Sequence, residues 1–191
     1  MSWLLAIAAL GFVLPVAAQS GADPVGAIRR TAPFEGGHGV MLGRDAAGRA
    51  VCYFREQGDT HQLDIGIGIG AAGAFVRLDT PEPRDATARH PVRVFAGLQQ
   101  IENGKATDRF KALDTFAGAV SFHVPRKDQA GFVIVAAGDP AAFLAVVAAA
   151  RRNFLVVESR QPPAAREYVG VGDFDRPAAD ALVACARRHP H

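Results

Sequence analysis

The chain has 191 residues, of which 49% are hydrophobic and 21% are charged, and its formal net charge is +2. This composition excludes an intrinsically disordered chain, because it supplies enough apolar surface for one folded domain with its own core. It also argues against a nucleic-acid-binding protein, because the basic residues are scattered along the chain and form no stripe.

Residues 1–18 have the pattern of a secretory signal peptide. From Trp3 to Ala18 the chain is uncharged and almost wholly apolar, and Val16 and Ala18 fit the −3 and −1 positions of a cleavage site. A retained membrane anchor is the alternative, but a bilayer span needs about 20 apolar residues. We therefore expect cleavage and export to the periplasm or the medium, with no transmembrane span in the mature chain.

Cys52 and Cys185 are the only two cysteines, one near each end of the mature chain. An even number of cysteines in an exported protein predicts a disulfide. Two buried free thiols or a redox pair are the alternatives, although the sequence contains no C-x-x-C motif. We expect a bridge between Cys52 and Cys185.

The first part of the mature chain predicts an irregular segment followed by strands. Residues 19–38 are rich in Gly, Pro and small side chains and predict an irregular lead-in, which leaves residues 39–191 as a single β-rich domain. Two β-type segments, 39–45 and 50–56, flank a short turn and predict a hairpin. In the second segment, Cys52 and Phe54 share one face, and Val51 and Tyr53 share the other.

Gly68, Gly70 and Gly73 spell G-x-G-x-x-G, the pattern of a dinucleotide-binding turn. That site needs a strand, the glycine turn, a helix and then an acidic residue about 20 positions later. Here isoleucines alternate with the glycines, a β-like segment follows, and Arg89 and His90 occupy the later position. We therefore expect a strand through the glycines and no nucleotide cofactor.

Residues 81–91 form the longest predicted loop and carry both charge signs. We take this loop as a candidate binding loop, because binding residues are often held on loops, although an ordinary solvated connection is the alternative. Its candidate residues are Arg84, Asp85, Arg89 and His90.

The rest of the chain predicts further strands and two helices. Segments 92–101, 117–124, 131–138, 154–160 and 166–174 have strand character, whereas 106–116 is ambiguous between strand and helix. Asp139 and Asp175 are expected to cap helices at about 139–152 and 175–188, each with proline near its start and two arginines near its end. The second helix places Ala178, Ala181, Leu182 and Cys185 on one apolar face.

These elements predict an α+β domain with a mostly antiparallel sheet. We expect a curved sheet or a sandwich of about eight or nine strands, and the apolar stripes of two late helices favour one sheet covered by helices.

Catalytic motifs are scarce in this sequence. It contains no G-x-S-x-G, H-E-x-x-H, P-loop or S-x-x-K motif. Ser20, Ser121 and Ser159 have no evident activating neighbour. Asp173 and Asp175 form a D-x-D pattern that favours helix capping over cation binding, and His189 and His191 give only a weak metal-ligand pattern. We expect no catalytic residue, cofactor or metal.

The last 30 or so residues, REYVGVGDF followed by DRPAADALVACARR, resemble the end of small exported bacterial β-proteins of the invasion-associated locus B type. The resemblance implies a small exported bacterial β-domain and assigns no functional residue.

Three functions remain open on the sequence. We favour a non-catalytic exported domain that binds a protein or a cell-envelope component. A hydrolase with a site assembled from distant residues and a carrier of a small ligand or metal are the alternatives. A flat apolar patch would favour the first, convergent polar side chains the second, and a cavity the third.

Overall fold

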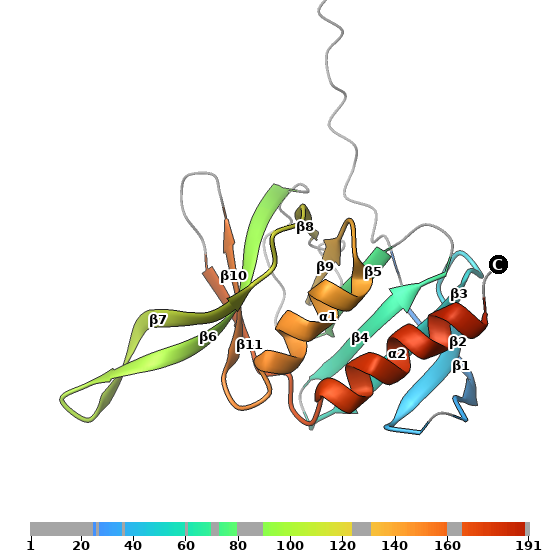
Figure 1. Cartoon of the computed structure of the whole chain (residues 1–191), viewed down its shortest axis with the longest axis horizontal. Helices are drawn as coiled ribbons and strands as arrows, with labels where there is room; N and C mark the ends of the chain where they lie inside the picture. Colours follow the sequence, from blue (N-terminus) through green and yellow to red (C-terminus); the bar gives the residue numbers. More distant parts are fainter. Residues whose placement is uncertain are drawn as a thin grey trace, which may run out of the picture.

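The computed structural model describes residues 25, 27–35, 37–59, 61–69, 73–79, 90–123, 131–159 and 166–189. Within them, eleven strands form one open sheet, and their strand pairs are antiparallel. Two helices lie side by side on one face of this sheet (Figure 1). The predicted α+β class with a mostly antiparallel sheet is confirmed.

The first half of the sheet is a meander in chain order. It consists of β1 (Arg29–Pro33), β2 (Val40–Arg44), β3 (Ala50–Gln57), β4 (Gln62–Gly68) and β5 (Gly73–Asp79). The predicted hairpin is β2–β3, and Asp45 shapes its turn. The Asp45 carboxylate accepts hydrogen bonds from the backbone of Ala47 at 2.9 Å and of Arg49 at 2.8 Å, as aspartate does in tight turns.

The second half of the sheet does not follow chain order. After β5 come β9 (Phe132–Ala136), β8 (Val120–His123), β6 (His90–Glu102), β10 (Phe154–Ser159) and β11 (Arg166–Val169). The remaining strand, β7 (Lys105–Thr115), pairs with the outer part of β6. Because β6 has 13 residues, it extends past its neighbours, and β6 and β7 project from the body (Figure 1).

One prediction about strands was wrong, and one assignment that the sequence left open is resolved; both concern edge strands. Residues 29–33, inside the predicted irregular lead-in, form β1, and the ambiguous segment 106–116 belongs largely to β7. These two strands raise the number above the predicted eight or nine. Most side chains of both strands are exposed, so neither has the apolar alternation that marks a half-buried strand.

The two predicted helices are α1 (Pro140–Ala149) and α2 (Arg176–Arg188). Asp139 and Asp175 cap them, accepting backbone hydrogen bonds at 2.9 and 3.0 Å. Over the sheet, α2 contacts β2, β3 and β4, whereas α1 contacts β5, β6 and β7. Both helices therefore bury their apolar residues against the same face, as their sequence patterns predicted.

Each face of the first meander is covered by a different apolar cluster. Cys52 and Phe54 belong to the large core under the helices. Val51 and Tyr53 point the other way, into a smaller cluster that includes Val25 and Ile28. The segment before β1 therefore covers the sheet face that the helices leave open.

The glycine-rich segment is the strand β4, followed by the strand β5. The prediction of a strand is confirmed as far as Gly68, whereas Gly70 lies outside the described residues. A dinucleotide site would need a helix after the glycines, and the strand β5 begins at Gly73 instead. A Cβ atom on Gly66 would lie 2.5 Å from the carbonyl oxygen of Cys52 and 2.7 Å from the ring of Phe75. Glycine at this position lets the Phe75 ring pack directly on the backbone of the sheet.

A disulfide joins Cys52 on β3 to Cys185 on α2, with 6.1 Å between their Cα atoms. Both residues are fully buried in the core between helices and sheet. The predicted bridge is confirmed, and it attaches the last helix to the first meander.

Replacing both cysteines by alanine is expected to lower the free energy of unfolding by about 4–5 kcal/mol, because the bridge closes a very long loop. In this variant, the amides of α2 should exchange faster than those of β4 and β5, since the helix loses its covalent attachment. Urea titration and hydrogen exchange measure the two effects. The bridge would be contradicted if the unmutated protein, denatured without a reducing agent, contained two free thiols per chain.

The substitution Gly66→Ala is expected to destabilise the fold by about 1–3 kcal/mol, because the new methyl group collides with backbone and with the Phe75 ring. Gly170→Ala is the matched control, because no atom lies within 4 Å of its added Cβ. Thermal unfolding of both variants checks the difference. Equal stability, or NAD binding that Gly66→Ala abolishes, would contradict the structural role of this glycine.

Candidate functional site

The candidate binding loop lies almost wholly outside the described residues. Arg84, Asp85 and Arg89 are not among them, and His90 is described only through its backbone, which pairs with Phe122 at the start of β6. The binding role of this loop therefore stays a prediction.

The D-x-D pattern caps a helix, as predicted. Asp175 accepts a hydrogen bond from the backbone of Ala178, and Asp173 and Asp175 each lie 3.4 Å from the guanidinium of Arg151. Arg151 thus links the end of α1 to the start of α2. The part of the chain that the structure describes holds no group of three His, Cys, Asp or Glu side chains suited to a metal. His189 is the C-cap of α2, and His191 lies outside the described residues.

Ser121 does have a histidine neighbour, which corrects the sequence analysis. Its hydroxyl oxygen lies 3.0 Å from Nε2 of His123. Residues two apart in a strand point to the same side of the sheet. The two side chains therefore meet although they are not adjacent in the sequence. His123 is only 6% exposed, and this hydrogen bond gives Nε2 of the buried imidazole a partner.

A buried ion pair lies on the sheet face opposite the helices. Asp64 on β4 is fully buried, and its carboxylate accepts hydrogen bonds from Arg55 Nε at 2.6 Å and Nη2 at 2.8 Å. Gln62 adds a third at 3.1 Å. Asp64 raises the pKa of Arg55 chiefly through the side-chain hydrogen bond, against the lowering effect of burial. This closed set of partners stabilises the pairing of β3 with β4.

Tyr53 lies beside this ion pair. The Arg55 guanidinium sits 5.0 Å from the centre of the Tyr53 ring, and burial is the main cause that raises the pKa of the Tyr53 hydroxyl. That hydroxyl is buried and has no hydrogen-bond partner among the described residues. A phenol held neutral among such neighbours fits a packing role better than a catalytic one.

The surface that stands out is the projecting β6–β7 hairpin, residues 97–115, which we call the arm (Figure 1). Its tip is a two-residue turn in which Asn103 and Gly104 both have positive φ, at 52° and 75°. This is the conformation that Asn-Gly favours in a tight hairpin. The two strands pair as far as Glu102 and Lys105.

Aromatic side chains hold the arm against the end of the sheet. Phe110 stacks on Tyr168 of β11, with 4.7 Å between ring centres, and meets Phe154 of β10 edge-on at 5.8 Å. A Cβ atom on Gly97 would lie 3.1 Å from Phe110, so this glycine leaves room for the ring. Arg166 also donates a hydrogen bond to the carbonyl of Asp108 at 2.7 Å. The base of the arm is therefore fixed.

The arm and the adjoining strand carry the large exposed apolar side chains of the described structure. These are Leu98 at 47%, Ile101 at 62%, Leu113 at 48% and Tyr168 at 41% exposed. No motif in the sequence marks these four residues. The available signal was the Asn-Gly turn between two long segments, but a strand that leaves the core cannot be recognised without its pairing partners.

Comparisons with protein-family models, with curated proteins and with solved structures found no match for this chain. The class that the structure defines is therefore an α+β domain with one open antiparallel sheet, two helices on one face and a projecting hairpin arm. No described helix is long and apolar enough to cross a membrane.

Asp64→Ala is expected to destabilise the protein by about 2–3 kcal/mol, because Arg55, whose side chain is partly exposed, loses two charge-assisted hydrogen bonds. Asp180→Ala is the matched control, since its ion pair with Arg176 is exposed on α2 and should contribute less than about 1 kcal/mol. Chemical unfolding of both variants measures the difference. Similar small effects would show that the buried pair does not stabilise the sheet.

Proposed function

We propose that this chain is a non-catalytic exported domain that binds a protein partner through the arm. The observation that carries the proposal is that the large exposed apolar side chains of the described residues, Leu98, Ile101, Leu113 and Tyr168, all lie on the arm and on β11 beside it. Large apolar side chains that stay exposed on one part of a folded domain can mark an interaction site. Export is supported by the apolar leader and is compatible with the disulfide.

Charge and hydrogen bonding indicate the chemistry of the partner. The arm carries three acidic residues, Glu102, Asp108 and Asp114, and three basic residues, Lys105, Arg109 and Lys111. This balance selects neither a strongly acidic nor a strongly basic partner. Within the described residues, β7 pairs with β6 along one edge and with no strand along the other. An extended segment with apolar side chains can add to that edge.

A second copy of the chain fits this edge poorly. Antiparallel pairing of β7 with itself about Phe110 would set Arg109 opposite Lys111 of the other copy. Pairing about Arg109 or about Lys111 would set each of these residues opposite itself. Like charges directly opposite each other destabilise a strand pair. In these three registers the charges of β7 disfavour self-association, which supports a different protein as the partner.

The hydrolase is the weaker candidate. Ser121 and His123 provide a nucleophile and a base at hydrogen-bond distance, but His123 is buried, and a substrate must reach both groups.

The test is site-specific photocrosslinking in the native producing cells, with a benzophenone amino acid at position 101 of the arm or at position 176 of α2. The partner captured at position 101 is then purified. Its affinity should fall at least about tenfold for the double variant Ile101→Ser/Leu113→Ser, because central apolar contacts dominate most interfaces. The unfolding transition of that variant should stay unchanged, since both side chains are exposed.

The double variant Arg176→Ser/Asp180→Ser is the matched control, because it also changes two exposed residues and should bind the partner normally. Capture at position 176 alone, or full affinity of the arm variant, would contradict the proposal. Binding to phosphatidylglycerol vesicles that the arm variant loses, with no protein captured at position 101, would identify a lipid surface and overturn it.

A further inference from the structure

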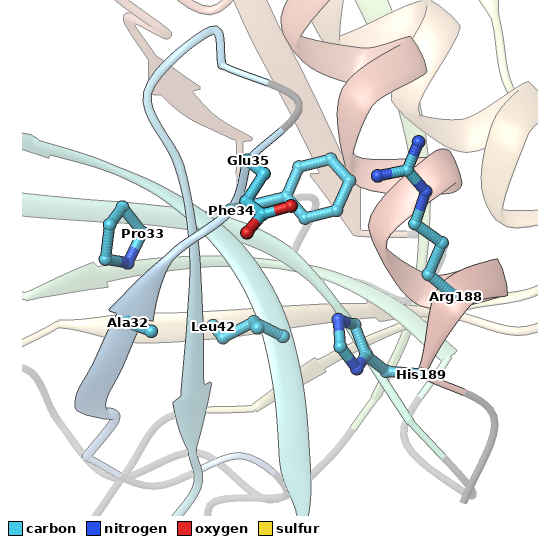
Figure 2. A pocket seen from close by; sticks show the side chains of 7 residues that line it. All are labelled: Ala32, Pro33, Phe34, Glu35, Leu42, Arg188 and His189. Carbon is cyan, nitrogen blue, oxygen red and sulfur yellow. The ribbon is translucent and has the colours of Figure 1, made fainter.

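A pocket of about 530 Å³ lies between the C-terminal end of α2 and the edge formed by β1 and β2 (Figure 2). It is at the opposite end of the sheet from the arm (Figure 1). Its volume falls within the range of about 300–1,000 Å³ that is typical of small-molecule sites. The pocket is therefore independent of the proposed protein-binding surface.

One side of the pocket is apolar. Ala32, Pro33 and Phe34 supply it from the end of β1, and Leu42 supplies it from β2. Phe34 is only 6% exposed and belongs to the main core, so its ring is a fixed part of the wall. A ligand with an apolar body would remove this surface from water.

The pocket has two charged side chains of opposite sign, which come from opposite walls, and the imidazole of His189 lines it at the end of α2. Arg188 projects from α2, with its guanidinium 5.3 Å from the centre of the Phe34 ring. Glu35 projects from the segment after β1, on the other side of that ring (Figure 2). Neither side chain forms an ion pair within the described residues, whose salt bridges lie elsewhere. Both are therefore available to a ligand.

We propose that this pocket binds a small zwitterionic molecule with an apolar body, of the class of a short apolar peptide. A guanidinium binds a carboxylate through two parallel hydrogen bonds, which assigns the ligand carboxylate to Arg188. The Glu35 carboxylate accepts hydrogen bonds from an ammonium group. The apolar side chains of the peptide then lie on Phe34 and Leu42.

A multiply charged anion fits the pocket less well. Arg188 is the one permanently cationic side chain among the lining residues, and Glu35 would repel a second negative charge. An uncharged apolar molecule would leave both charged groups without a partner. A zwitterion supplies one opposite charge to Arg188 and one to Glu35.

The disulfide holds the two walls of the pocket together. Cys185 lies three residues before Arg188 on α2, and Cys52 pairs across β2–β3 with Leu42 of the apolar wall. Reducing this bridge with dithiothreitol, which oxidises the reagent and leaves two cysteine thiols, frees the helix end that carries Arg188. Binding should therefore require the oxidised protein.

The experiment is calorimetric titration of the oxidised protein with Leu-Leu, N-acetyl-Leu-Leu and Leu-Leu amide. The zwitterion should bind most tightly, because it alone engages both charged residues. Arg188→Gln should weaken the free dipeptide and the acetylated form about three- to tenfold and leave the amide unchanged. Glu35→Gln should weaken the free dipeptide and the amide and leave the acetylated form unchanged.

Arg187→Gln is the matched control, because Arg187 is exposed in the same helical turn and does not line the pocket. It should bind all three probes normally. Absence of saturable binding, or equal affinity of the native protein for the three probes, would overturn the proposal. Binding of decanoate without binding of Leu-Leu would also overturn it, since the ligand would then be a simple apolar anion. None of these results depends on the arm.

Discussion

The bond between Cys52 and Cys185 joins the two parts of the chain that define one end of the molecule. Cys52 lies in β3, at the middle of the first meander, and Cys185 lies on the buried face of the last helix. Because α2 contacts β2, β3 and β4 through the core around this bond, the helix has one position over the sheet. That position brings Arg188 next to Phe34. The position of α2 over the core and the shape of the pocket therefore both depend on this disulfide.

The opposite face of the meander depends on a different interaction. Its apolar cluster is small, and the buried pair of Arg55 and Asp64 adjoins it. An ion pair in such a place contributes little net stability compared with apolar packing, but breaking it leaves a buried charge. A slip of β4 by one residue would turn the Asp64 carboxylate toward the helices and their apolar core. The pair therefore favours one register of β3 and β4 over its neighbours.

The helices, the disulfide and most strands could be predicted from the sequence, because their signals are local. Asp139 and Asp175 sit directly before their helices, and the alternation of isoleucine and glycine is visible within β4. The strand that the sequence did not predict, β1, and the one that it left ambiguous, β7, are edge strands whose exposed side chains follow no period of two. The pocket is harder still to predict from the sequence, because its lining residues lie far apart in the chain. Glu35 and Arg188 line one pocket only because α2 folds back across the sheet, and no local pattern in the sequence reports that arrangement.

The position of the two candidate binding surfaces follows from how the sheet is covered. The helices cover one face, and the segment around Val25 and Ile28 covers part of the other, so the centre of the sheet presents little surface to a partner. Contacts with other molecules are left to the ends, where β1 and β7 are edge strands. Exposed edges invite unwanted pairing unless charged or proline residues interrupt them. Arg29, Arg30 and Pro33 on β1, and charged side chains of both signs on β7, interrupt these two edges. The same residues therefore also restrict which partners each end can accept.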